Sequence, residues 1–152
     1  MLKLGERAPL FSAEGTKGRF DLRDYLGKKH IVLIFYSSND SNVCTRQLSA
    51  ARDDESQFIK LDTLVVGINQ AGLDDHQDLA MRKHYDFPLL PDKDLLINRL
   101  YEVGKSFIGT GQPRTIYVIG KDGLIHYAEH GSRPTDEIME AIRRIIQVKA
   151  PE

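Results

Sequence analysis

The chain has 152 residues, of which 41% are hydrophobic, and this suits one compact domain with a substantial core. Its formal net charge of −1 excludes the large basic field typical of proteins that bind nucleic acid or an anionic membrane. The apolar runs are far too short to cross a bilayer, and the start MLKLGERAPLF lacks the long apolar core of a secretory signal. We therefore expect one cytoplasmic domain over residues 1–152.

The first half of the chain predicts buried strands separated by a helix. Residues 18–27 indicate a short strand followed by a brief helical turn that ends at Gly27. The apolar runs 29–37 and 61–69 are typical of strands that are buried on both faces. Between these runs, residues 43–58 carry apolar side chains at helical spacing.

The second half predicts three helices and a hairpin. Residues 73–85 and 93–103 indicate amphipathic helices, and the two prolines in 87–92 favour a short extended segment between them. Residues 114–131 form two β-rich runs around a Lys-Asp-Gly turn, which predicts a hairpin. Residues 135–148 predict a closing amphipathic helix.

Strands that alternate with helices and end in a hairpin predict an α/β fold, with a central mixed β-sheet and helices on both faces. Cys44 then lies just beyond the carboxyl end of a central strand, in the first turn of a helix. In open α/β sheets this is the edge where ligands and catalytic groups gather.

Cys44 is the only cysteine, which excludes an internal disulfide and any C-x-x-C motif. One interpretation is structural, since free cysteines are often buried. The other is chemical: a helix N-terminus favours a thiolate, which is the nucleophilic form of cysteine. A polar loop, residues 37–42, precedes Cys44 and favours the second interpretation.

Two further residues are candidates for a site around Cys44. Ser41 lies three residues earlier, so its hydroxyl could contact the sulfur, act as an ordinary N-cap, or do both. Arg114 opens a later strand and could approach the same sheet edge, or it could be a solvated strand-end cation. None of the five histidines shows metal-ligand spacing with a cysteine or a second histidine. We expect no metal and no bound cofactor.

Several segments, taken in order, resemble the peroxiredoxins of the alkyl hydroperoxide reductase and thiol-specific antioxidant superfamily. The resemblance is greatest to the bacterioferritin-comigratory, or Q-type, branch. It covers nearly the whole chain, with His76 at the position of a family histidine. The matching segments are GERAPLF (5–11), GRFDLRDYLGKKHIVLIFYS (18–37), VCTRQL (43–48), VVGINQAGLDDHQDLAMRKHYDFPLLPD (65–92) and PRTIYVIGKDGLI (113–125).

The resemblance implies a thioredoxin-like fold and a thiol-dependent peroxidase that reduces hydrogen peroxide or small organic hydroperoxides. Cys44 is then the nucleophile that becomes a sulfenic acid. Arg114 would stabilise the thiolate and the polarised peroxide. Ser41 occupies the position of the family threonine whose hydroxyl binds peroxide.

The active-site loop departs from the family pattern, which predicts a more polar, wetter and less rigid pocket. A carboxylate at position 40 that faced the sulfur would disfavour the thiolate. The departures are Ser37 for proline, Asn39 and Asp40 for aspartate and phenylalanine, Asn42 for proline, and Gln47 for glutamate. The alternative function is therefore a weakly active or inactive peroxiredoxin-like domain that senses oxidant or binds a partner.

Ser49 occupies the position where many Q-type relatives carry a resolving cysteine. The resemblance thus implies a one-cysteine mechanism, in which thioredoxin, glutaredoxin, glutathione or the Cys44 of a second subunit resolves the sulfenic acid. The expected partners are a peroxide and this thiol reductant, with no nucleic acid and no membrane. The chain is a monomer or a homodimer, and residues 125–131 are a candidate exposed sheet edge.

Overall fold

The computed structural model describes residues 1–105 and 111–149, so residues 106–110 and 150–152 of the predicted domain lie outside the described residues. The strands are β1 (Ser12–Gly15), β2 (Gly18–Asp21), β3 (His30–Phe35), β4 (Thr63–Asn69), β5 (Leu89–Pro91), β6 (Thr115–Ile119) and β7 (Ile125–His130). The helices are the 3₁₀-helix η1 (Leu22–Tyr25) and the α-helices α1 (Asn42–Asp53), α2 (Glu55–Lys60), α3 (Leu73–Lys83), α4 (Leu96–Leu100) and α5 (Thr135–Lys149).

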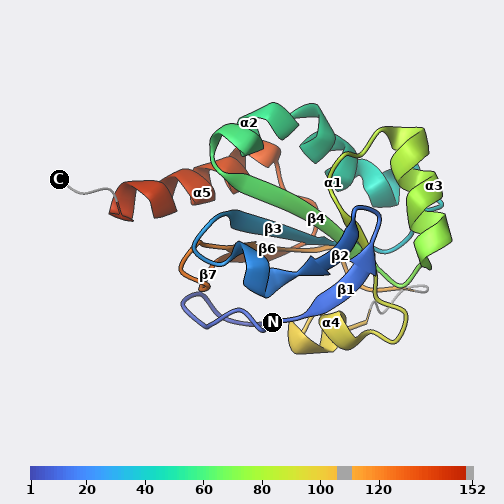
Figure 1. The fold of residues 1–152 in the computed structure, drawn as a ribbon, viewed down its shortest axis with the longest axis horizontal. Helices are drawn as coiled ribbons and strands as arrows, with labels where there is room; N and C mark the ends of the chain where they lie inside the picture. The colour runs from blue at the N-terminus through green and yellow to red at the C-terminus, as the bar shows by residue number, and fades with distance from the viewer. Residues whose placement is uncertain (106–110, 150–152) are drawn as a thin grey trace.

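Five of the strands form one sheet in the order β5-β4-β3-β6-β7. Figure 1 shows its central strands β3, β4 and β6. Strands β3, β4 and β5 run parallel, whereas β6 is antiparallel to both β3 and β7. Strands β1 and β2 make a separate antiparallel hairpin. The predicted α/β fold with a mixed central sheet is confirmed, and β7 lies at an edge of the sheet, as its sequence suggested.

Strand β3 is buried along its whole length because it has a hydrophobic cluster on each face. Val32 and Ile34 face a cluster that includes side chains of α1, α2, α3 and α5. Ile31 and Leu33 face the second cluster, which includes side chains of β2, η1 and α4. The alternation of side chains along a strand explains why the whole run had to be apolar.

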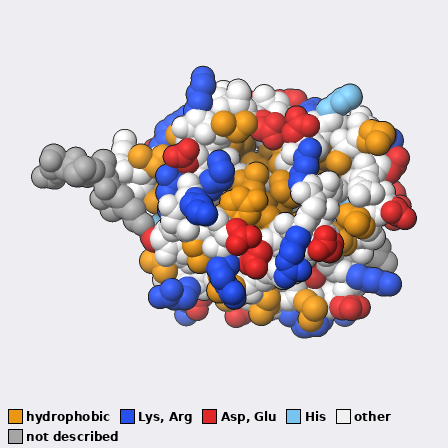
Figure 2. Space-filling model, in the orientation of Figure 1, with side chains coloured by type: hydrophobic (Ala, Val, Ile, Leu, Met, Phe, Trp, Pro, Cys, Tyr) orange, Lys and Arg blue, Asp and Glu red, His pale blue; other side chains and the backbone are white. Residues whose placement is uncertain are grey.

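The surface carries both charges. On the face shown in Figure 2, Lys and Arg side chains are interspersed with Asp and Glu around a central group of hydrophobic side chains. No helix within the described ranges is long and apolar enough to cross a membrane.

Two predicted helices differ from the observed ones, and one observed strand was not predicted. The expected helix over 43–58 is broken at Asp54, where α1 ends and α2 begins. The expected helix over 93–103 is only α4, because Leu95 adopts a left-handed conformation (φ 58°) before its first residue. The strand β1 was not expected, since its sequence SAEG has no apolar alternation.

Candidate active site

Cys44 is the third residue of α1 and is half-buried. The loop from β3 turns into α1 at Ser41, whose extended backbone (φ −127°, ψ 133°) is typical of an N-cap. The ladder of the helix begins with a hydrogen bond from Thr45 N to Ser41 O of 3.1 Å. Cys44 therefore lies in the turn where backbone N–H groups and the helix dipole favour negative charge.

The sulfur of Cys44 accepts a hydrogen bond from the hydroxyl of Ser37, with 3.0 Å between Oγ and Sγ. Ser37 is the second residue after β3, so the end of the central strand delivers this hydroxyl to the sulfur. In the family resemblance Ser37 is only a replacement for proline, and no local spacing indicated its contact with Cys44.

The hydroxyl of Ser41 caps α1, because Ser41 Oγ accepts from Val43 N at 3.2 Å. Among the described residues, Ser41 donates no hydrogen bond to Cys44 or to another group. The O–H of Ser41 is thus available as a donor beside the first turn of the helix.

Arg114 directly precedes β6 and is half-buried. Its guanidinium donates to Ser132 Oγ at 2.7 Å, and its carbonyl accepts from Gly131 N at 2.7 Å. Within the described residues it makes no hydrogen bond to Cys44.

Gln47 lies in α1, one turn after Cys44, and it bonds the segment whose Ser132 accepts a hydrogen bond from Arg114. Gln47 Nε2 donates to Arg133 O at 2.8 Å, and Arg133 N donates to Gln47 Oε1 at 2.9 Å. Arg133 follows Ser132 in the chain. The bonds of Gln47 therefore join α1 to the segment that contains the partner of Arg114, at the end of the sheet where β3 ends and β6 begins. The structure thus places Cys44, Ser41 and Arg114 at the same end of the sheet.

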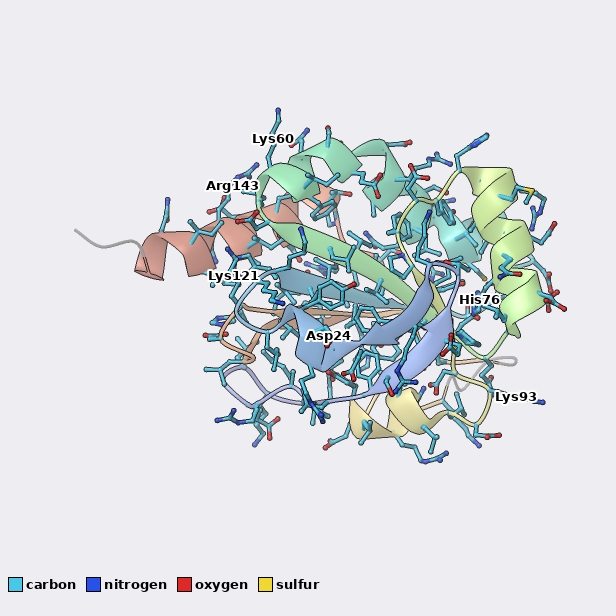
Figure 3. All side chains as sticks on the ribbon, in the orientation of Figure 1. Asp24, Lys60, His76, Lys93, Lys121 and Arg143 are labelled. Atoms are coloured by element: carbon cyan, nitrogen blue, oxygen red, sulfur yellow. The ribbon has the colours of Figure 1, made fainter. Side chains whose placement is uncertain are left out.

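A buried polar network surrounds the same end of β3. Asn39 Oδ1 accepts from Tyr36 OH at 2.7 Å and from Asn69 Nδ2 at 3.0 Å. Asn39 Nδ2 lies 3.3 Å from His76 Nδ1, and Tyr36 OH lies 3.2 Å from the same nitrogen. Figure 3 shows His76 at the foot of α3, at one end of the sheet, with Lys121 at the other end.

Burial sets the protonation of this network. It lowers the pKa of His76 below its ordinary value of 6.5 and raises the pKa of Tyr36 above its ordinary value of 10.0. The tyrosine is therefore neutral, and it donates its single proton to Asn39 Oδ1. Asn39 Nδ2 can only donate, which assigns His76 Nδ1 as the acceptor of a neutral ring. Asn39 is therefore fixed by hydrogen bonds to three side chains, those of Tyr36, Asn69 and His76.

Gln112 fixes the strand ends beneath the loop. It is buried, and its Nε2 donates to Tyr36 O at 3.1 Å and to Ile68 O at 2.8 Å. Asn98 Nδ2 donates to Gln112 Oε1 at 2.8 Å and so orients the amide. Sequence reasoning missed Gln112 and Asn69, because their partners lie far away in the chain.

The remaining departures from the family pattern lie around the first turns of α1. Asp40 is exposed, and within the described residues it makes no hydrogen bond to Cys44. Asn42 Oδ1 accepts from Lys83 Nζ at 2.7 Å. Ser49 Oγ lies 2.7 Å from Tyr85 OH, so a hydroxyl pair occupies the place of the resolving thiol. No group of three or more His, Cys, Asp or Glu in the described part of the chain is placed to hold a metal ion.

Comparison with known proteins shows which family the chain belongs to. The family model of the AhpC/TSA family matches residues 4–128. A protein of Coxiella burnetii named as a bcp peroxiredoxin is 28% identical over 151 residues, covering 95% of this chain and 99% of the relative. The chloroplastic peroxiredoxin Q of Sedum lineare is 28% identical over 147 residues, which cover 95% of this chain and 78% of the relative.

Among solved structures, the crystal structure of peroxidoxin BcpB from Mycobacterium tuberculosis superposes with a TM-score of 0.87. The two chains are 22% identical, and the match covers 95% of this chain and 99% of the other. This likeness confirms the thioredoxin-like fold expected from the sequence.

Proposed function

The chain belongs to the AhpC/TSA family of peroxiredoxins, which are thiol peroxidases, and on this premise we propose that it is a one-cysteine peroxidase with Cys44 as its nucleophile. The observation that carries the proposal is the place of Cys44: a half-buried sulfur in the first turn of α1, with a hydroxyl donor at 3.0 Å. The proposed substrates are hydrogen peroxide and small organic hydroperoxides.

In the first step the Cys44 thiolate attacks one peroxide oxygen. The S–O bond forms as the O–O bond breaks, and the departing hydroxide or alkoxide takes up a proton to leave as water or alcohol. The sulfur is oxidised by two electrons to a sulfenic acid, and the peroxide is reduced by the same two electrons.

Two side chains are proposed to assist this step. The O–H of Ser41 is free to donate to the peroxide, since its oxygen caps α1 through Val43 N. The guanidinium of Arg114 stabilises the negative charge that moves from sulfur to the leaving oxygen. Its hydrogen bond to Ser132 Oγ leaves most of the guanidinium N–H groups for this task.

The sulfenic acid is proposed to react with an external thiol, giving a mixed disulfide and water. A second thiol then releases the Cys44 thiol and leaves with the first as a disulfide. The chain has no second cysteine, and Ser49 pairs with Tyr85 instead. Thioredoxin, glutaredoxin and glutathione are the proposed donors, and a cytoplasmic location and a monomeric or homodimeric state stay predictions.

The test is peroxide turnover with each donor, combined with intact-mass analysis of the protein after one equivalent of hydrogen peroxide. We expect one added oxygen on Cys44, conversion to a mixed disulfide by glutathione, and sustained peroxide loss with at least one donor. The Cys44→Ser variant controls for direct reaction of the donor with peroxide.

Peroxide loss that is equal in the wild type and in Cys44→Ser would overturn the proposal. The chain would then be the alternative, a peroxiredoxin-like domain that binds a partner. A sulfenic acid that forms no faster than on a free thiol would also exclude the enzyme.

A further inference from the structure

We propose that Ser37 is a catalytic residue whose hydroxyl donates to the Cys44 sulfur and stabilises the thiolate, which leaves the hydroxyl of Ser41 to bind the peroxide. This assignment rests on the proposed function only for its chemistry; the contact itself is the 3.0 Å hydrogen bond from Ser37 Oγ to Cys44 Sγ. A hydrogen bond from an O–H group to a charged acceptor is stronger than one to a neutral acceptor. The bond from Ser37 therefore favours the thiolate of Cys44 over its thiol.

The backbone before Ser37 is held rigidly. Tyr36 is fully buried, its N–H donates to Ile68 O at 3.2 Å, and its carbonyl accepts from Gln112 Nε2 at 3.1 Å. Because Gln112 also donates to Ile68 O, the end of β3 is joined to the end of β4 directly below the active-site loop.

The backbone of Gly111 also packs closely against Ser37. A Cβ added at Gly111 would lie 2.9 Å from Ser37 O and 3.4 Å from Ser37 Cβ, and the φ of Gly111 is +106°. Only glycine tolerates both this approach and this conformation. The close packing limits how far Ser37 can move from the sulfur.

The backbone after Ser37 is anchored by Asn39, whose side-chain oxygen accepts from Tyr36 OH and Asn69 Nδ2. The chain is thus fixed one residue before Ser37 and two residues after it. Between these anchors the Ser37 hydroxyl is pre-organised toward the sulfur, and its donation requires little ordering in the reaction.

The two hydroxyls of the loop therefore have different partners. The oxygen of Ser41 is engaged by Val43 N, and the described residues show no acceptor for its O–H. The O–H of Ser37 is already directed to Cys44 Sγ. One hydroxyl serves the nucleophile and the other remains for the incoming oxygen.

The test compares the wild type with Ser37→Ala, Ser37→Thr and Ser38→Ala. Ser38 is the matched control, because it is the adjacent half-buried serine but accepts from Asp40 N and does not contact sulfur. Each protein is alkylated with iodoacetamide over a range of pH, and the rate constant with hydrogen peroxide is measured at pH 7. Circular dichroism confirms that each variant is folded.

We expect the peroxide rate constant of Ser37→Ala to fall about tenfold. Its alkylation should reach half of the plateau rate at a higher pH than in the wild type. Ser37→Thr should restore both properties, and Ser38→Ala should leave both unchanged.

An alkylation profile that is unchanged in Ser37→Ala would overturn the assignment, as would a loss that Ser37→Thr does not restore. Alkylation does not depend on peroxide, so a wild type that fails as a peroxidase would refute the proposed function while the profile still decides on Ser37.

Discussion

Arg114 bonds Ser132, the residue directly before Arg133, and the partners of the two arginines separate their roles. Arg133 forms a two-point ion pair with Glu137, with both nitrogen–oxygen distances at 2.7 Å, and its guanidinium helps to hold the pKa of Glu137 at about 2. Arg114 has no carboxylate partner among the described residues and bonds only the neutral Ser132 through its side chain. At the scale of single residues, Arg114 is the arginine whose charge is free to act on an anion.

Replacing Arg114 with alanine should lower the rate constant for peroxide by about 100-fold, because the transition state loses a charged donor. The free energy of unfolding should change little, since the side chain is only half-buried and has one neutral hydrogen bond. Stopped-flow kinetics measure the first effect, and urea denaturation measures the second.

The matched control is Arg143→Ala, which removes an exposed arginine from α5 (Figure 3). Equal rate losses in the two variants would mean that Arg114 acts only through the general charge of the protein.

The sequence predicted the three candidate residues of this site but not the hydrogen bonds that each of them makes. Cys44, Ser41 and Arg114 were identified from local position and from the family resemblance. The contact of Ser37 with Cys44 was missed because no helical or strand spacing relates a loop residue to the sulfur. Gln112 was missed because its bond to Tyr36 joins residues 76 positions apart. Such contacts depend on strand order, which a single sequence reveals only coarsely.

At the scale of elements, helix α1 both presents the nucleophile and connects the parts of the site. Its N-terminus is capped by Ser41, and Gln47 bonds the backbone of Arg133 just before α5. The same helix thus holds the sulfur at one end and fixes the segment that positions Arg114.

Variants of Ser41 should separate the cap of α1 from the chemistry. Ser41→Ala should lower the free energy of unfolding by about 1 kcal/mol, whereas Ser41→Gly should cost only a few tenths. Both variants lose the hydroxyl, so both should react with peroxide about tenfold more slowly. Ser41→Thr should keep stability and rate.

Urea denaturation and peroxide kinetics on the same samples check this prediction. A rate that follows helix stability, with Ser41→Gly as fast as the wild type, would show that the serine acts only as a cap.

Gln47→Ala should lower the free energy of unfolding by about 2 kcal/mol, because it removes two hydrogen bonds and leaves backbone groups of Arg133 unpaired. Gln77→Ala, which changes an exposed glutamine of α3, is the control and should be nearly neutral. Urea denaturation measures both, and equal stabilities would contradict the connecting role of Gln47.

Elements with strong patterns were predicted well, and those that depend on tertiary contacts were not. The apolar runs gave β3 and β4, and the hairpin of β6 and β7 followed from its turn residues. The break at Asp54 was missed, since its φ of −108° and ψ of 16° lie outside the helical region while the side-chain pattern continues into α2. Strand β1 is stabilised by pairing with β2, a contact that its own residues do not indicate.

At the scale of the whole molecule, two apolar clusters enclose the sheet, and two buried histidines lie on β3 and on α3. His30 and His76 are 3% and 0% exposed, and each has a hydrogen-bond donor directed at Nδ1, from Lys121 N and from Asn39 Nδ2. Burial lowers the pKa of both histidines below 6.5. Burial thus favours the neutral form of both rings in the folded protein.

Acidification should destabilise the protein. In the unfolded chain both histidines take up a proton near pH 6.5, whereas in the folded chain they do so only at a lower pH, so the stabilisation is complete above pH 6.5. Below it, the free energy of unfolding should fall by up to about 1.4 kcal/mol per pH unit for each histidine. Urea denaturation at pH 7.5 and pH 5.5 measures the loss.

The control for the pH dependence is His84→Asn, which removes an exposed histidine and keeps a residue that tolerates its left-handed conformation (φ 58°). The decrease in the free energy of unfolding between pH 7.5 and pH 5.5 should persist in His84→Asn and should become smaller in His76→Asn. A free energy that is equal at the two pH values would contradict the neutral state of the buried histidines.

The central claim is that the fold activates the Cys44 sulfur toward peroxide. The most direct measurement mixes reduced protein with sub-stoichiometric hydrogen peroxide at pH 7 in a stopped-flow instrument, with Cys44→Ser as the control. We predict consumption that depends on Cys44 and is at least about 100-fold faster than that of a free cysteine thiol. Consumption no faster than that of the free thiol would contradict the account.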